Sequence, residues 1–343
     1  MSIELGGRKV AIIGGAGFIG HNLALTLAAR GAKVQVIDSL QVNNLLSLTS
    51  SDHTPNRELY LRMINERLAL LNGAGITLHP LDARDYHVLG RVISDINPQV
   101  IVHLAAVSHA GRSNKDPFST FDHSLRTLEN ALDCARDRVE QFIFLSSSMA
   151  YGDFLTDEVA EDHPLNPIGI YAALKVAGEK IVIAYQQVFK LPYTIIRPSA
   201  LYGPRCVSRR VGQIFIEAAM RGEPLRMDGD GSDRLDFTYI DDLVEGIALA
   251  IGNPAALNEI FNVTFGQARS IRELVDLVRQ RFPGVDVESV DRDRLMPHRG
   301  TLSIAKASRL LGYRPRYQLE TGIDKYIDWY RTLMSSTSVQ VGS

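Results

Sequence analysis

The sequence predicts an α/β protein with a doubly wound parallel sheet and a smaller C-terminal lobe. In the first 200 residues, short apolar and β-branched runs alternate with longer helical patterns, which is typical of parallel strands joined by right-handed crossovers. The strand-like runs are almost continuously apolar, as expected of a sheet that is covered on both faces. After Pro198, Gly, Pro and Arg become frequent, which indicates a different substructure.

Six strands and, outside one long insertion, four helices are predicted before Pro198. The strands are expected at Lys9–Ile13, Lys33–Ile37, Ile76–His79, Val100–Leu104, Gln141–Leu145 and Tyr193–Arg197. The helices are expected at Asn22–Ala29, Asp85–Ile96, Thr120–Ala135 and Ala172–Val188. Residues 39–75 exceed an ordinary βα connection, and Arg57–Leu71 within them has helical periodicity. We therefore expect an insertion with its own helix at this end of the sheet.

The C-terminal part begins with turn-rich sequence. Residues Leu225–Asp236 are predicted to form a hairpin around the Asp-Gly-Asp-Gly turn at 228–231. Helices are expected at Asp241–Ile251 and Ile271–Phe282, and a strand at Ile260–Val263 that returns to the main sheet. Residues 1–198 with 237–265 are predicted to form the first domain, 199–236 with 266–335 the lobe, and 336–343 a disordered tail.

Composition excludes several classes of protein. The formal net charge of −2 argues against a surface that binds nucleic acid generally. Two cysteines, Cys134 and Cys206, exclude a disulfide scaffold and a Cys-rich zinc site, so no metal is expected and a reducing compartment is favoured. No apolar run reaches the 18 or more residues of a membrane span, and Met1–Lys9 lacks the features of a signal peptide. We expect a cytoplasmic globular protein.

A glycine-rich turn follows the first predicted strand. Gly14, Gly17 and Gly20 permit a tight turn before the predicted helix, and Phe18 and Ile19 within this segment are also expected to contact the cofactor. Backbone N–H groups and the positive end of the helix dipole can bind a pyrophosphate there. Because the second strand ends in an acid, Asp38, the ribose hydroxyls of NAD can be bound and the 2′-phosphate of NADP repelled. The alternative for Asp38 is a solvated turn residue.

A second acidic group follows the third strand. Asp82 and Ala83 are predicted to lie near the adenine of NAD. The alternative is a helix N-cap, and this applies at least as well to Asp85.

Tyr171 and Lys175 lie four residues apart, so a helix places a phenol and an ammonium on one face. A free tyrosine has a pKa of about 10, and a neighbouring cation favours its phenolate. Lys175 could also hold the nicotinamide ribose. Ser146, Ser147 and Ser148 follow the fifth strand, at the carboxyl edge where doubly wound sheets bind ligands. The alternative for the serines is a cap of the next segment.

These motifs occur in the order found in a known family. The sequence resembles the extended short-chain dehydrogenase/reductases, in the NAD-dependent epimerase/dehydratase group that acts on nucleotide sugars and has a Rossmann domain with a substrate-binding lobe. The matching segments are Gly14–Gly20, Asp38–Leu40, His103–Ala106, Phe144–Gly152, Tyr171–Lys175, Arg197-Pro198, Tyr202–Arg205 and Asp228–Asp242.

The resemblance assigns roles to several residues. It implies that Tyr171 is the catalytic base, Lys175 its partner and Ser147 the substrate-facing hydroxyl. It implies an NAD pocket lined by Leu104, Ala105, Ala106 and Ser146, and a lobe in which Arg205 and the segment after Leu225 bind a nucleotide-diphosphate sugar. It also implies a homodimer in which the helices around Thr120–Cys134 and Ala172–Val188 form an intersubunit four-helix bundle.

The chain departs from the family pattern at several positions. Dehydratases of the group have an Asp-Glu pair where this chain has Ser148 and Met149. Arg234 is displaced by one position from the family's phosphate-binding arginine, and His123 lies in a segment where many relatives have Asn. The second phosphate-binding arginine of the lobe could be Arg292, Arg294 or Arg299. The residues expected to face the sugar are His109, Arg112, Ser113, Ser148 and Met149.

Three functions are compatible with these motifs. We expect an NAD-dependent nucleotide-sugar epimerase that acts at C4, because epimerisation does not need the missing acidic pair. A dehydratase, a decarboxylase or a reductase of the same family is the first alternative. A non-catalytic dinucleotide-binding sensor or structural subunit is the second, although such chains commonly lose the Tyr or Lys that this one retains.

Overall fold

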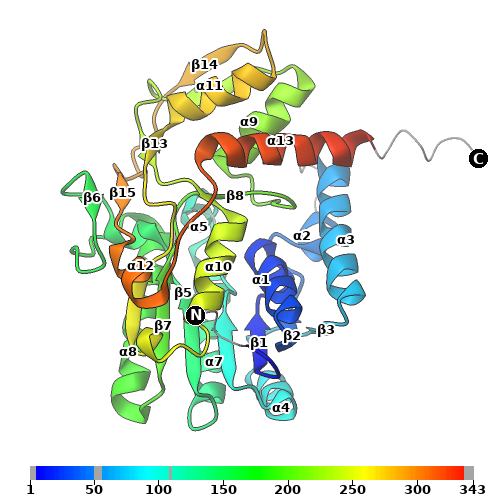
Figure 1. Cartoon of the computed structure of the whole chain (residues 1–343), viewed down its shortest axis with the longest axis vertical. Helices are drawn as coiled ribbons and strands as arrows, with labels where there is room; N and C mark the ends of the chain where they lie inside the picture. The colour runs from blue at the N-terminus through cyan, green and yellow to red at the C-terminus, as the bar shows by residue number, and fades with distance from the viewer. Residues whose placement is uncertain (1–4, 50–55, 108–109, 336–343) are drawn as a thin grey trace, which may run out of the picture.

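The computed structural model describes residues 5–49, 56–107 and 110–335. His109 and the predicted disordered tail at 336–343 lie outside the described residues. A seven-stranded parallel sheet forms the centre of the molecule, with helices on both faces (Figure 1). In spatial order its strands are β12 (Glu259–Asn262), β7 (Tyr193–Arg197), β5 (Gln141–Leu145), β4 (Val100–His103), β1 (Lys9–Ile13), β2 (Lys33–Asp38) and β3 (Thr77–Pro80). The predicted doubly wound fold is therefore confirmed.

Successive side chains of the central strands enter two different cores. Along β1, Val10 and Ile12 belong to one buried cluster, whereas Ala11 and Ile13 belong to the other. Because strand side chains alternate between faces, a continuously apolar strand can fill the cores on both sides of the sheet. This is the physical reason that near-continuous apolar runs marked the strands in the sequence.

Helices cover each face of the sheet. The first core contains side chains of α1 (Phe18–Ala29), α3 (Arg57–Gly73), α10 (Ile240–Ala250) and α13 (Leu319–Ser335). The second contains side chains of α4 (Tyr86–Ile96), α7 (Thr127–Ala135) and α8 (Gly169–Phe189). The remaining helices are α2 (Leu45–Thr49), α5 (Ala110–Lys115), α6 (Pro117–Phe121), α9 (Val211–Arg221), α11 (Ile271–Arg281) and α12 (Ala305–Leu311).

The predicted insertion contains α2 and α3, and α3 lies beside α1 (Figure 1). The helix predicted at Thr120–Ala135 is divided into α6 and α7 by a π-helical turn, Asp122–Arg126. A π turn holds one more residue than an α-helical turn, and such turns are frequent at functional sites.

The predicted hairpin at Leu225–Asp236 is wrong. The strand β9 (Leu225–Asp228) pairs in parallel with β14 (Val287–Val290), and β10 (Arg234–Leu235) pairs antiparallel with β13 (Arg269–Ser270). The intervening segment does turn, with positive φ values of 60° at Gly229 and 78° at Gly231. The turn was therefore predicted correctly, but the strands on either side of it pair with later segments of the chain and not with each other.

Two further short strand pairs lie outside the main sheet in the described part of the chain. They join β6 (Glu158–Val159) to β15 (Thr301–Leu302), and β8 (Leu201–Tyr202) to β11 (Thr238–Tyr239). Within the main sheet, β12 pairs in parallel with β7 at the edge and starts one residue before the predicted strand. The division of the chain into domains stays a prediction. In the described part of the chain, every helix is too short or too polar to cross a membrane.

Candidate active site

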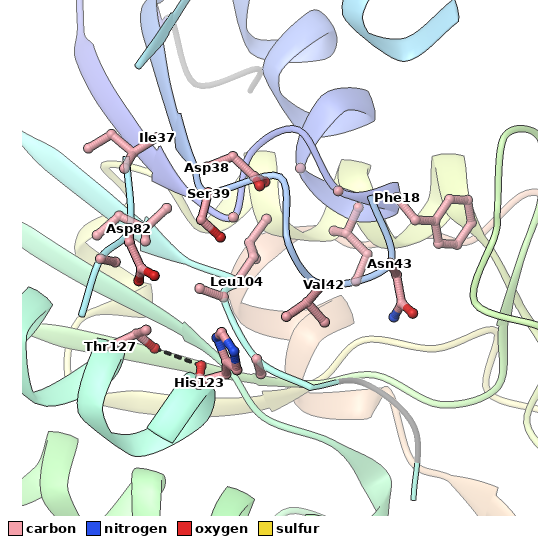
Figure 2. A pocket seen from close by; sticks show the side chains of 18 of the residues that line it. Phe18, Ile37, Asp38, Ser39, Val42, Asn43, Asp82, Leu104, His123 and Thr127 are labelled. Carbon is pink, nitrogen blue, oxygen red and sulfur yellow. Dashed lines mark hydrogen bonds between the residues drawn. The ribbon is translucent and has the colours of Figure 1, made fainter. Parts of the chain in front are cut away.

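A pocket opens at the carboxyl edge of the central sheet (Figure 2). It is formed by the β1–α1 turn, the ends of β2, β3 and β4, the π turn and parts of α3 and the lobe. The predicted cofactor-binding residues that line it are Gly14, Gly17, Phe18, Ile19, Asp38, Asp82, Ala83, Leu104, Ala105 and Ala106. It is also lined by Gly20, Arg67, His123, Thr127, Ser208 and Arg210.

The glycine turn allows segments of backbone to approach closely. Gly14 has a φ of +83°, and a Cβ atom there would lie 2.7 Å from the backbone nitrogen of Ala105. A Cβ on Gly20 would lie 2.4 Å from the Cα of Gly15. The turn therefore requires glycine at both positions. The helix α1 begins at Phe18 without a side-chain N-cap, so its first N–H groups remain available to an anion.

Asp38 is half-buried at the pocket and is hydrogen-bonded to the backbone. Its carboxylate accepts hydrogen bonds from the backbone nitrogens of Ala16 at 3.0 Å and Leu40 at 2.7 Å. Burial raises the pKa of Asp38, while these two bonds oppose the rise. Each carboxylate oxygen has further accepting capacity, which fits the ribose hydroxyls of a dinucleotide.

Asp82 and Asp85 have different surroundings. Asp85 caps α4 by accepting a hydrogen bond from the backbone nitrogen of Val88 at 3.1 Å, so the N-cap alternative applies to this residue. Asp82 lies at the pocket, where its Oδ2 atom is 2.6 Å from Nη2 of Arg84. Burial acts to raise the pKa of Asp82, but the hydrogen bonds from Arg84 outweigh it and the pKa is lowered. The adenine contact of Asp82 stays a prediction.

Ser147, Tyr171 and Lys175 lie together at the end of β5. Ser147 starts a 3-10 turn and accepts a hydrogen bond from the Met149 nitrogen at 3.2 Å. Its hydroxyl also acts on Tyr171, in the first turn of α8, in the direction that lowers the pKa of the phenol. Nζ of Lys175 donates to the Leu145 carbonyl at 2.7 Å and lies 5.8 Å from the centre of the Tyr171 ring. Local motifs from two elements thus form one cluster, as their order in the sequence predicted.

The charges around Tyr171 differ from the prediction. Burial raises the pKa of Tyr171, and the groups that oppose this are Arg210, the Ser147 hydroxyl and Arg299. Burial also lowers the pKa of Lys175 to about 8, against the raising effect of Glu179. The sequence pattern assigned the stabilisation of the phenolate to Lys175, whereas the structure adds two arginines of the lobe.

Arg210 is a site residue that sequence reasoning missed. It precedes α9, lines the pocket, and has a buried Nε atom without a hydrogen-bond partner among the described residues. Its burial and position depend on how the lobe folds over the sheet edge. The signal that could have found it is the Arg209-Arg210 pair shortly after the Tyr202–Arg205 motif.

The three candidate arginines of the lobe are now distinguished. Nε of Arg292 pairs with Asp233 at 2.7 Å, and Arg294 is exposed. Arg299 is half-buried, acts electrostatically on Tyr171, and has a buried Nε atom without a hydrogen-bond partner in the described part of the chain. Burial lowers the pKa of Arg299 to about 10, so it remains a cation at neutral pH. Arg299 is therefore the candidate of the three that fits an anionic substrate.

The remaining predicted substrate residues are placed as follows. The Ser148 hydroxyl is 3.1 Å from the Ser199 hydroxyl, and Met149 is buried. Arg205 donates to His21 and Glu66, each at 3.0 Å, and Arg234 donates to the Ala268 carbonyl at 2.9 Å. Arg112 belongs to α5, and its side chain lies outside the described part. Among the described residues, no three His, Cys, Asp or Glu side chains lie together in a way that could hold a metal ion. The substrate contacts stay predictions.

A buried polar network lies behind the site. The Glu179 carboxylate accepts hydrogen bonds from Arg197 at 2.9 and 2.7 Å and a short one from the Ser146 hydroxyl. Arg197 also donates to the Tyr151 hydroxyl at 2.9 Å, and Tyr151 donates to Asn262 at 2.7 Å. This network joins α8 to β7, β5 and β12 directly beneath the predicted catalytic residues.

Comparisons with known proteins agree with this geometry. The profile of the NAD dependent epimerase/dehydratase family matches residues 10–264. A UDP-glucose 4-epimerase of Mycolicibacterium smegmatis is 30% identical over 329 residues, which cover 94% of this chain and 98% of that protein. A dTDP-glucose 4,6-dehydratase of an Actinoplanes species is 27% identical and covers 94% of this chain and 98% of its own length.

Solved structures of similar fold belong to the same kinds of enzyme. The UDP-glucose 4-epimerase of Thermus thermophilus in complex with NAD has a TM-score of 0.80 and 27% identity, covering 94% of this chain and 98% of that one. The UDP-glucuronic acid 4-epimerase of Bacillus cereus, in complex with UDP-glucuronic acid and NAD, has a TM-score of 0.81 and 26% identity, covering 95% and 100%. The Rossmann fold and the NAD cofactor expected from the sequence are thereby confirmed, and the chain belongs to the NAD-dependent epimerase/dehydratase family.

Proposed function

We propose that the protein is an NAD-dependent nucleotide-sugar epimerase that inverts C4 through a transient 4-keto sugar. The observation that carries the proposal is the absence of a carboxylic acid at the two positions after Ser147. At these positions, the Ser148 hydroxyl is hydrogen-bonded to the Ser199 hydroxyl, and the apolar side chain of Met149 is buried. A 4,6-dehydratase needs an acid and a base to expel the C6 hydroxyl, whereas epimerisation needs neither.

The proposed mechanism begins with Tyr171, which takes the proton of the C4 hydroxyl. Arg210, Arg299 and the Ser147 hydroxyl favour its phenolate. Ser147 donates a hydrogen bond to the same sugar oxygen and holds it in line with Tyr171. The chemistry that NAD supplies when bound is the reversible two-electron oxidation of the C4 alcohol. The flat 4-keto sugar rotates so that its other face is reduced, and Tyr171 returns the proton to the oxygen.

Two regions of the chain would hold the substrate and the cofactor. The glycine turn and Asp38 would bind NAD, and Lys175 would bind its nicotinamide ribose. Arg210 and Arg299 are cations whose Nε atoms are free within the described part of the chain, which supports their binding the diphosphate of the sugar nucleotide. Net redox change is zero in this reaction, so NAD remains bound through the catalytic cycle.

The test is a screen of UDP-, dTDP-, GDP- and CDP-sugars with detection of the sugar product by NMR. The proposal expects an epimer inverted at C4, no net NADH and NAD that co-purifies with the protein. Loss of water or CO₂, or stoichiometric NADH, would instead identify a dehydratase, a decarboxylase or a reductase. Tyr171→Phe should lower turnover by orders of magnitude and retain NAD, and normal turnover in this variant would exclude the mechanism. NAD binding without turnover of any sugar nucleotide would favour a sensor or structural subunit.

We also propose a homodimer formed through the helices around Thr120–Cys134 and α8. Its support is the row of exposed apolar side chains on α6 and α8. Phe118 is 84% exposed and Val188 68% exposed, and Phe121, Ile170 and Phe189 are exposed as well. Light scattering should give twice the mass of the chain, and Phe118→Asp should reduce it to the monomer if this face forms the interface.

A further inference from the structure

The inserted helix α3 contributes a charged residue to the cofactor pocket. Arg67 lies in α3, is completely buried and lines the pocket together with Gly17, Phe18 and Gly20. These three residues belong to the glycine turn and the first turn of α1. The insertion lies beside α1 (Figure 1), and its Arg67 lines the same pocket as the first turn of that helix.

The hydrogen bonds of Arg67 leave its charge uncompensated. Nε donates to the Arg205 carbonyl at 3.0 Å, and Nη2 donates to the same oxygen. This backbone carbonyl carries no net charge. Nη1 is buried and has no hydrogen-bond partner among the described residues. Burial lowers the pKa of Arg67 to about 10, so the side chain is still a cation at neutral pH.

In the described part of the chain, no carboxylate accepts a hydrogen bond from this cation. His21 is buried, and burial together with Arg67 and Arg205 holds its pKa well below the usual value, so it is neutral. Asp38 attracts Arg67 electrostatically, but its printed hydrogen bonds are to the backbone nitrogens of Ala16 and Leu40 and not to the guanidinium. A buried charge with an unsatisfied N–H is costly unless an anion binds there. The start of α1 favours an anion at the same place.

We propose that Arg67 binds the pyrophosphate of NAD, as a second phosphate-binding group beside the glycine turn. Its free Nη1 donates to a phosphate oxygen in a charge-assisted hydrogen bond. The other two nitrogens remain on the Arg205 carbonyl, so the bond to the segment Tyr202–Arg205 fixes the guanidinium in place. The insertion between β2 and β3 therefore serves cofactor binding.

The experiment measures nucleotide binding by calorimetry, using the full-length protein freed of NAD. NAD, ADP-ribose and adenosine are titrated into the parent protein and Arg67→Met. We expect Arg67→Met to weaken the binding of NAD and of ADP-ribose by roughly 10- to 100-fold, since both carry the pyrophosphate. The binding of adenosine, which lacks it, should weaken by less than about 3-fold. Arg67→Lys keeps a cation and should recover part of the affinity for NAD.

Arg62→Met is the matched control, because Arg62 lies on the same helix and donates to the Leu333 carbonyl. It should bind all three ligands as the parent does. Equal weakening of adenosine and ADP-ribose by Arg67→Met would show a purely structural role and overturn the proposal, as would unchanged NAD binding. If Arg67→Met does not fold, Arg67→Gln, which keeps a donor for the Arg205 carbonyl, carries the same expectation.

Discussion

Replacement of Glu179 by glutamine tests the buried network beneath the site. The side chains of Arg197 and Glu179 are only 2% and 1% exposed, and two hydrogen bonds of 2.9 and 2.7 Å join them. Removing one charge from such a pair leaves the other buried and uncompensated, which costs about 3–5 kcal/mol. Because glutamine keeps one acceptor oxygen, we expect a loss near 3 kcal/mol. With an unfolding entropy of about 0.7 kcal/mol/K for a chain of this length, Tm should fall by about 4 °C.

The assay is thermal unfolding followed by circular dichroism, with Glu140→Gln as the matched control. Glu140 pairs with Arg8 but is 58% exposed, so its replacement should change the stability by less than about 1 kcal/mol. The double variant Glu179→Leu with Arg197→Met removes both charges and should be more stable than Glu179→Gln. A fall in Tm no larger than that of Glu140→Gln, or a double variant less stable than the single one, would refute the reasoning.

Three further perturbations test the site. Gly14→Ala places a Cβ 2.7 Å from a backbone nitrogen at a φ of +83°, so the variant should lose NAD binding in calorimetry; parental affinity would contradict the close approach. Asp38→Ala should weaken the binding of NAD by about 10-fold and reduce the preference of the protein for NAD over NADP. An unchanged ratio of the NAD and NADP dissociation constants would exclude the ribose contact. The cation of Arg210 lowers the pKa of Tyr171, so Arg210→Met should shift the rising limb of the pH–kcat profile to higher pH, and an unshifted limb would remove Arg210 from this role.

The strands of the central sheet could be predicted because each one fills two cores. An apolar run of about five residues with β-branched side chains is a local signal, and Lys9–Ile13, Gln141–Leu145 and Tyr193–Arg197 have the predicted bounds. The hairpin prediction failed for the opposite reason. β10 has two residues, and its partner β13 lies more than 30 positions later, so the pairing leaves no pattern in the local sequence.

The residues of the candidate site also include some that local sequence patterns predict and some that they do not. The glycine turn, Asp38 and the Tyr171–Lys175 spacing are local patterns with a physical cause, and the structure brings them to one edge of the sheet. Arg67 could not be found locally, since an arginine in a helical pattern usually lies in solvent, and the pairing of Arg210 with Arg209 was its only local signal. Their burial follows only from the packing of the insertion and the lobe around the pocket. The catalytic roles themselves stay predictions.

The position of β12 has a consequence for synthesis of the chain on the ribosome. Strand β7 ends at Arg197, and the neighbour that covers its outer edge begins at Glu259. At a synthesis rate of about 5–20 residues per second, the roughly 60 residues between them take about 3–12 s to appear. During that interval the nascent sheet has an apolar strand with an uncovered edge, which is a template for wrong pairing. Slower translation of this stretch should therefore increase aggregation and the demand for chaperones, without any change in the stability of the finished protein.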